Sequence, residues 1–326
     1  MMSTAAAGKN RLAGNVVLAP PSKAGDTVFK LVTWCMAMMV FVLVVLVGWE
    51  LFQGSALSLK KFGWGFLIHS DWDPVSGNFG ALPFIVGTFV SSVLGLMIAL
   101  PLSLATAIYL TELAPGWVRQ PAISLIEMLA AIPSVILGLW GIFVLVPWLR
   151  DHPFPLLQKL FGFLPIFRGH IYGASMLSAA VIIAIMIVPI VTSISREVFR
   201  AVPDSRREAA AALGATRWEV TRLAVLHGSM RGVFGAAMLG LGRALGETMA
   251  VTMVIGNSPD ISASLFAPGY TLASAIANEF TEAADDMYRS ALFELGLVLL
   301  LVTIVTNILA HLLVGAVSAP KDGGHA

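Results

Sequence analysis

The strongest constraint on this chain is a series of long apolar segments separated by polar connections. Six segments reach roughly 20 mostly apolar residues, the length that a helix needs to cross a bilayer. They are 29–51, 82–110, 122–149, 172–194, 232–256 and 290–316. Only 12% of the residues are charged, and the mean hydropathy is +0.85. Because backbone polar groups cannot remain unpaired in hydrocarbon, we predict an all-α, polytopic membrane protein with six transmembrane helices.

The composition argues against several other classes of protein. A net charge of +1, without a run of lysines or arginines, provides no overall attraction to nucleic acid. The single cysteine, Cys35, excludes an internal disulfide and a multi-cysteine metal site. The segment 29–51 is longer than the apolar core of a signal peptide, which has about 7–15 residues. We therefore interpret it as a retained first span.

The distribution of lysine and arginine predicts the orientation, because these residues accumulate on the cytoplasmic side. With a cytoplasmic N-terminus, thirteen of them lie inside: Lys9, Arg11, Lys23, Lys30, Arg119, seven arginines from Arg196 to Arg231, and Lys321. Six lie outside: Lys60, Lys61, Arg150, Lys159, Arg168 and Arg289. Both termini are therefore predicted to be cytoplasmic.

Small residues and prolines predict how the helices pack and bend. Small residues occur at every fourth position of the second segment, at Gly87, Ser91, Gly95, Ala99 and Ser103. Such a face lets another helix backbone approach closely. The prolines inside apolar runs, Pro101, Pro133 and Pro189, each free a carbonyl and permit a kink.

The longest predicted cytoplasmic connection, 195–231, contains signals for a short exposed helix. Pro203 ends whatever helix precedes it. Ser205 and Glu208 have the spacing of a capping box, so we expect an alanine-rich helix over 206–213.

The second half of this connection, which leads to the fifth apolar segment, also contains helix start and stop signals. Gly214 fits the left-handed position that ends a helix, and Thr216 with Glu219 has the spacing of a second capping box. Two interpretations remain open for the whole connection. It is either a solvated loop with helix caps or a helix that docks on a cytosolic partner.

Arg243 and Glu247 lie four residues apart inside the fifth apolar segment, on one helical face. A charge at that depth costs about 2.5–3.5 kcal/mol on insertion scales, and pairing offsets part of this cost. The pair could simply fix helix packing. Alternatively, the guanidinium could bind a phosphate-like oxyanion, with Glu247 limiting the affinity so that the anion can leave. A proton-coupled carrier could also use such a glutamate.

No catalytic constellation is recognisable. The sequence has no H-E-x-x-H, no G-x-S-x-G and no P-loop, so we predict no catalytic residue, no metal site and no ATP hydrolysis of the P-loop kind by this chain. A secondary anion carrier driven by an ion gradient, and an intramembrane hydrolase, remain as alternative functions.

Several motifs resemble those of a known family. Glu208, Ala209 and Ala210, followed by Gly214, resemble the EAA loop of ABC importer permeases, although His227 stands where that family has a proline. The stretches GLGRALGETMAVT (240–252), IGN (255–257) and IPSVILGLWGIFVLVP (132–147) closely resemble the phosphate ABC transporter permeases of the PstC type.

The resemblance implies a set of partners and roles. A type I importer of this kind combines a PstC-type and a PstA-like permease subunit with two cytosolic PstB-like ATPase subunits and an external PstS-like phosphate-binding protein. ATP and Mg²⁺ would bind to the ATPase, and no cofactor to this chain. Arg243 and Glu247 are then the expected pathway residues, and Glu208, Ala209, Ala210 and Gly214 the expected ATPase contacts. The outer loops 52–81 and 258–289 are candidates for docking the binding protein, and the location would be the inner membrane.

The predicted organisation has four parts. They are a cytoplasmic tail (1–28), a first transmembrane helix with an outer loop (29–81), a permease core of five helices with the coupling loop 195–231 (82–316), and a cytoplasmic tail (317–326).

Overall fold

The computed structural model describes residues 23–318, and its regular elements are helical throughout that range. The α-helices are α1 (Lys23–Gly54), α2 (Ala56–Phe62), α3 (Leu82–Ile108), α4 (Gly116–Ala130), α5 (Ser134–Trp140), α6 (Val146–Asp151), α7 (Pro153–Phe161), α8 (Met176–Arg200), α9 (Asp204–Ala212), α10 (Arg217–Val220), α11 (His227–Leu245), α12 (Met249–Val254), α13 (Leu272–Glu279) and α14 (Asp286–Ser318). Two 3₁₀ turns, η1 (Gly63–Leu67) and η4 (Pro165–Phe167), and three π-helical turns, η2 (Tyr109–Leu113), η3 (Gly141–Leu145) and η5 (Thr221–Leu226), complete the set.

Within this range, six helical stretches are long and apolar enough to cross a membrane. They are Gly25–Gly54, Leu82–Leu113, Ser134–Phe161, Met176–Arg200, Arg217–Leu245 and Asp286–Leu313. This agrees with the predicted number of spans, but several boundaries differ. The first helix begins at Lys23, inside the predicted tail 1–28. The rest of that tail, and residues 319–326 of the C-terminal tail, lie outside the described residues.

The chain forms two compact units, divided after Trp49. In the first unit, the described residues belong to α1, whose apolar window has a mean hydropathy of 2.6. A helix that is apolar on every face is typical of a lipid-facing span.

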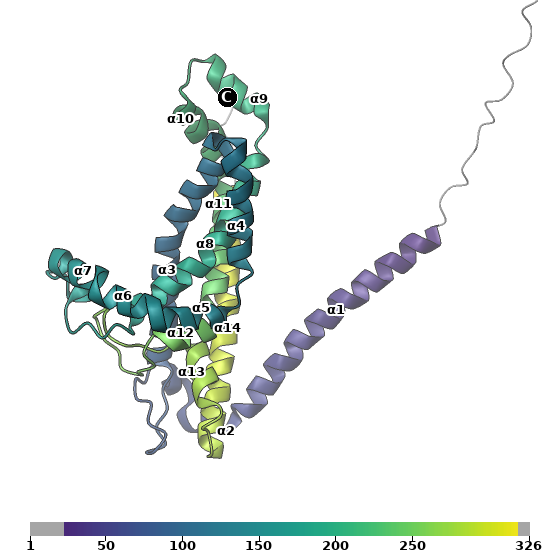
Figure 1. Ribbon diagram of the computed structural model, residues 1–326. Coiled ribbons are helices and arrows are strands. Elements are labelled where there is room, and N and C mark those ends of the chain that lie inside the picture. Colours follow the sequence, from purple (N-terminus) through teal and green to yellow (C-terminus); the bar gives the residue numbers. More distant parts are fainter. Residues whose placement is uncertain (1–22, 319–326) are drawn as a thin grey trace, which may run out of the picture. The chain divides into compact units, whose positions relative to one another are not determined.

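The second unit is a helical bundle built around α8. Figure 1 shows α3, α8, α11 and α14 running along one another, with α4 beside α8. The small residues of α3 that the sequence singled out are all buried. A Cβ atom on Gly95 would lie 2.6 Å from Cγ2 of Ile183 on α8, so this position has no room for a side chain. The predicted close helix contact is therefore present, and α8 is the helix that makes it.

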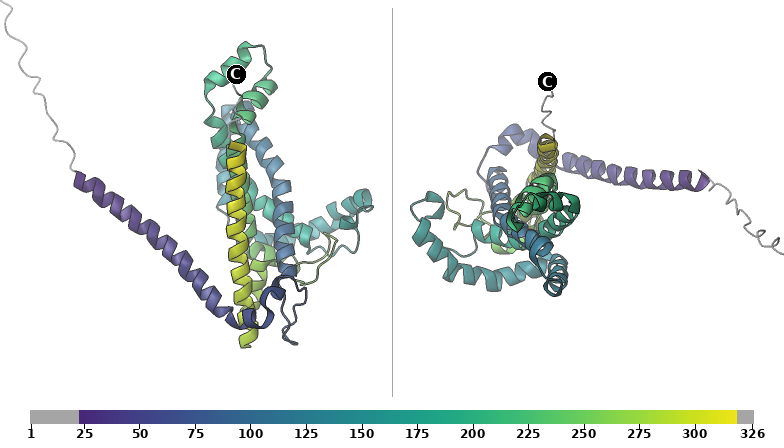
Figure 2. Two further views of the ribbon diagram at one scale, coloured as in Figure 1. Left: turned by 180° about the vertical axis from the view of Figure 1, so that it is seen from behind. Right: turned by 90° about the horizontal axis from the view of Figure 1, so that it is seen from above.

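The prediction of one continuous third span over 122–149 is wrong. α4 ends at Ala130 and α5 begins only at Ser134, with Pro133 as its N-cap. Proline lacks the N–H that would continue the helix, and it disfavours helical geometry in the residue before it. After this break α5, α6 and α7 run sideways from the bundle (Figures 1 and 2).

The fifth span lies closer to the N-terminus than predicted, because it covers Arg217–Leu245 instead of 232–256. α11 ends at Leu245, and a non-helical break over 246–248 separates it from the short helix α12. The expected helix over 232–256 is therefore two helices. At its start, η5 continues into α11 at His227 without interruption.

The connection 55–81 folds against α13 and the start of α14. Trp72 donates its indole N–H to Oε2 of Glu279 at 2.7 Å, and Tyr288 donates its hydroxyl to the same oxygen at 2.8 Å. Around them lies a cluster of buried aromatic side chains that includes Phe66, Phe79 and Phe84. One carboxylate thus joins the connection to α14.

Candidate functional site

Arg243 lies near the C-terminal end of α11, and its side chain is 47% exposed. The position of Arg243 and Glu247 inside an apolar segment predicts that both charges are buried, and this prediction is wrong for the arginine. Only Glu247 is buried, with 5% of its side chain exposed. The Arg243 side chain is therefore about half accessible, and the carboxylate of Glu247 bears the larger cost of burial.

Glu247 lies in the break between α11 and α12 rather than inside a helix. Its Oε2 is 3.3 Å from Nη2 of Arg243, so the expected ion pair is present. Its Oε1 accepts the backbone N–H of Ala250 at 3.4 Å. The carboxylate therefore holds Arg243 on one side and the first turn of α12 on the other, which stabilises the charge through both an opposite charge and a backbone donor.

The exposed guanidinium lines a cavity of about 510 Å³ between α11 and α14. The lining residues are Gly235, Met238, Leu239, Gly242, Arg243, Thr303, Asn307, Ala310 and His311. Because the two large apolar side chains and the three glycine or alanine residues offer no side-chain donor to an anion, recognition in this cavity depends on its four polar side chains.

The polar residues that α14 contributes to this cavity were missed in the sequence. Thr303, Asn307 and His311 are spaced by four, so they form one polar stripe on an apolar helix. That spacing places them on one face, and polar residues inside a span usually face a protein interior or a cavity. The hydroxyl of Thr303 donates to the carbonyl of Leu299 at 2.8 Å, which leaves Asn307 and His311 as the freer polar groups opposite Arg243.

The second candidate region is the short helix α9, which carries Glu208, Ala209 and Ala210. The predicted capping box of Ser205 and Glu208 is wrong: α9 begins at Asp204 after Pro203, without a side-chain cap. The capping box of Thr216 and Glu219 is confirmed at the start of α10. Because Glu208 makes no capping bond, its carboxylate remains free for another contact.

Gly214 terminates α9 as predicted. Its φ is +83°, in the left-handed region. The N–H of Ala215 donates to the carbonyl of Ala210 at 3.3 Å, and that of Gly214 to Ala211 at 2.9 Å, which is the bonding pattern of a Schellman motif. Large apolar side chains on both sides of Gly214 are exposed to solvent: Leu213 is 91% exposed and Trp218 is 63% exposed.

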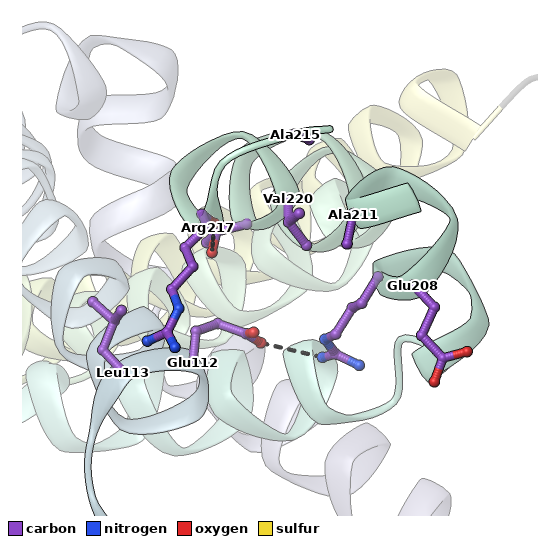
Figure 3. Close-up of a pocket in the computed structure, with 9 residues that line it drawn as sticks. Glu112, Leu113, Glu208, Ala211, Ala215, Arg217 and Val220 are labelled. Carbon is purple, nitrogen blue, oxygen red and sulfur yellow. Dashed lines mark hydrogen bonds and ion pairs between the residues drawn. The ribbon is translucent and has the colours of Figure 1, made fainter. Parts of the chain in front are cut away.

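Arg207 attaches α9 to the bundle, a role that the sequence did not indicate. Its Nη2 donates to the carbonyl of Phe199 at 2.9 Å and to Oε1 of Glu112, in η2, at 3.2 Å. Its Nη1 donates to the carbonyl of Val202 at 2.6 Å and to Asp204 at 2.9 Å. Figure 3 shows the ion pair of Glu112 in the lining of a cavity of about 340 Å³ to which Glu208 also contributes.

Comparison with known proteins places these features in a family. Residues 99–319 match the model of the "Binding-protein-dependent transport system inner membrane component" family. The chain is 48% identical over 293 residues to the phosphate transport system permease protein PstC of Pasteurella multocida, covering 89% of this chain and 91% of that protein. It is 45% identical to PstC of Haemophilus influenzae over 300 residues (91% and 95%) and 46% identical to PstC of Mesorhizobium japonicum over 298 residues (90% and 91%).

A solved structure is similar in fold. A chain of the MetNI methionine ABC transporter, in an inward facing conformation, superposes with a TM-score of 0.50 at 18% sequence identity. The match covers 73% of this chain and 94% of that chain. At this identity the likeness shows a common fold and nothing more.

Proposed function

The chain belongs to the family of binding-protein-dependent transport system inner membrane components and, within it, to the phosphate transport system permease proteins PstC, and from this we propose that it forms one half of the translocation pathway of an ATP-driven phosphate importer. The relatives are permease proteins, so the chain is a permease subunit and not an enzyme. The hydrolase and the secondary carrier, which the sequence left open, find no support among them.

One observation carries the assignment of the pathway: Arg243 presents an accessible guanidinium to a cavity while a buried carboxylate holds it in place. A guanidinium offers donors in a planar fork that suits the oxygens of phosphate. Asn307 and His311 add neutral or weakly basic groups on the opposite wall. We assign to this cavity the transient binding of phosphate during passage.

Glu247 has a distinct role in this proposal. With Glu247 ionised, the pair has no net charge, so an anion gains hydrogen bonds from the arginine without a large excess of positive potential. Such a station binds the ion and still lets it leave, as transport requires. Loss of Glu247 would increase the attraction and also release the first turn of α12.

The helix α9 supports a contact with a cytosolic ATPase. Glu208 and Ala209 are exposed, and Gly214 ends the helix so that Leu213 projects with 91% exposure. An exposed apolar side chain of this size, beside a free carboxylate, suits a protein interface. We propose that Glu208, Ala209, Ala210 and Gly214 form the coupling contact.

The remaining partners follow from the family. We propose a PstA-like second permease subunit, a PstB-like ATPase dimer that binds ATP and Mg²⁺, and a PstS-like phosphate-binding protein that docks on the loops 52–81 and 258–289. The charge distribution supports an inner-membrane location with both termini cytoplasmic, and α9 then lies on the cytoplasmic side.

Replacing the pathway arginine tests the proposal. In the assembled transporter, Arg243→Gln should lower phosphate uptake at least a hundredfold, because both the charge and the fork are lost, while Arg243→Lys should retain a small part of it. Arg150→Gln, which removes a 52% exposed arginine of α6 outside the proposed docking loops, should leave uptake within twofold. Uptake by Arg243→Gln at the wild-type rate would exclude Arg243 from the pathway, and loss of the assembled complex on gel filtration would show that Arg243 serves packing.

A further inference from the structure

A second, strongly basic cavity lies at the end of the bundle that carries α9. Its volume is about 170 Å³, and η2, α4 and α8 enclose it. The lining residues are Leu110, Thr111, Arg119, Gln120, Ile123, Arg196 and Arg200. None of these side chains belongs to the pathway or the coupling contact described above.

The charges in this cavity are not balanced. Nη2 of Arg196 lies 3.7 Å from Oε1 of Glu127, which exceeds hydrogen-bond length, and Glu127 is 60% exposed. Arg119 donates through Nη2 to the carbonyls of Thr111 and Ala114, at 3.3 and 3.1 Å, and these carbonyls neutralise no charge. Its buried Nε has no hydrogen-bond partner among the described residues. Arg200 forms no ion pair within the part of the chain that the structure describes.

The arrangement is unfavourable unless an anion is present. Arg196 and Arg200 lie four residues apart on α8, a spacing at which like charges repel. Arginine remains protonated at any physiological pH, so the repulsion cannot be relieved by loss of a proton. Only 12% of the Arg196 side chain is exposed, so water screens this charge less than it screens a fully open one.

The position of the cavity indicates the kind of anion. Arg200 ends the candidate span Met176–Arg200, and Thr111 lies in the last turn of the candidate span Leu82–Leu113. The cavity therefore lies at the level where a span meets the membrane surface. Guanidinium groups and a glutamine amide are suited to a tetrahedral oxyanion with several acceptor oxygens.

We propose that Arg119, Arg196 and Arg200 bind a phosphate group at this membrane surface. The same chemistry has two sources, the headgroup of an anionic phospholipid and inorganic phosphate. Arg119 is anchored by two backbone carbonyls, so it forms the fixed wall of the site, and Arg196 and Arg200 close around the ligand from α8.

The test uses the assembled transporter in lipid nanodiscs, in two arms. In the first, phosphatidylglycerol replaces part of the phosphatidylcholine without added phosphate, and retained phosphatidylglycerol is counted by native mass spectrometry. In the second, inorganic phosphate is titrated in pure phosphatidylcholine, with Arg243→Gln present so that the pathway makes no contribution. Arg196→Gln and Arg200→Gln are compared with Arg222→Gln, which removes an exposed arginine outside the cavity.

We expect saturable binding in at least one arm, weakened about tenfold or more by Arg196→Gln and by Arg200→Gln but less than twofold by Arg222→Gln. Binding in the first arm identifies the lipid headgroup as the source, and binding in the second identifies free phosphate. The proposal is overturned if neither arm distinguishes the two cavity variants from wild type, or if Arg222→Gln weakens binding as much as they do. In phosphatidylcholine without phosphate, the two cavity variants should unfold at temperatures no lower than that of the wild type, because each relieves a like-charge repulsion, which excludes misfolding as the cause.

Discussion

Arg243 and Glu247 occupy unequal environments, with 47% and 5% of their side chains exposed. This difference decides what each can do. The carboxylate is held by a guanidinium and a backbone N–H, so it is a fixed part of the structure. The arginine has one partner and an open cavity in front of it, so it is the group that can exchange ligands.

Asn307, on the opposite wall, provides a residue-scale prediction. Asn307→Leu keeps a similar volume but removes the amide, so the KM for phosphate uptake should rise about tenfold, because a hydrogen bond to a charged ligand is worth roughly 1.5–3 kcal/mol. Thr306→Val is the matched control, since Thr306 is the adjacent polar residue on α14 and does not line the cavity. KM is measured by uptake of labelled phosphate. Equal KM values for the two variants would show that Asn307 does not contact phosphate in the pathway.

At the scale of the elements, the proposed coupling depends on the contacts that connect α9 to the rest of the bundle. Arg207 contacts the end of α8 through two carbonyls and η2 through Glu112. With 20% and 15% of their side chains exposed, Arg207 and Glu112 form a better shielded pair than an ordinary surface salt bridge. A movement imposed on α9 would therefore be transmitted to α3 and α8, the helices with the closest packing.

Glu112 and Asp204 both form an ion pair with Arg207, so substitutions of these two carboxylates can be compared directly. Glu112→Gln should lower phosphate-stimulated ATPase activity of the assembled transporter several-fold, because it removes the shielded contact between α9 and η2. Asp204→Asn removes a carboxylate that is 88% exposed and should change the activity less than twofold.

The comparison of Glu112→Gln and Asp204→Asn has a clear negative outcome. If both variants hydrolyse ATP and take up phosphate at wild-type rates, α9 does not transmit movement through Glu112. If Asp204→Asn lowers ATPase activity more than Glu112→Gln does, the N-terminal end of α9 transmits the movement through Asp204 instead of through Glu112.

At the scale of the whole molecule, the family likeness extends over about nine tenths of the chain and its PstC relatives. The cavity at Arg243 and the exposed residues of α9 are both accessible to contact with other subunits. Transport is expected to belong to the complex rather than to this chain.

This expectation can be tested by purification and reconstitution. Purified in mild detergent, the chain should co-elute with a second permease subunit and an ATPase, identified by mass spectrometry. Reconstituted alone, it should take up no phosphate with ATP or with a proton gradient. Uptake by the chain alone, driven by a proton gradient, would instead support the secondary carrier, and ATP-driven uptake with the ATPase but without a second permease would contradict the heterodimer.

Much of the candidate site could be predicted because its signals are local. The pairing of Arg243 with Glu247 depends on a spacing of four, and Gly214 and the Thr216–Glu219 box depend on backbone geometry within one turn. The Ser205–Glu208 box failed although its spacing was correct, because α9 begins at Asp204, two residues earlier than predicted, behind Pro203. Local signals indicate that a helix exists more reliably than they indicate its first residue.

The sequence by itself determined the membrane class and the number of apolar spans, because the free energy of burying side chains in lipid is set by composition over each segment. It also determined the family. Only the tertiary structure decided which charges meet: Arg207 and Glu112 are 95 positions apart, the wall opposite Arg243 comes from α14, and three arginines from α4 and α8 share one cavity. The packing of separate helices sets these distances, and no local pattern encodes it.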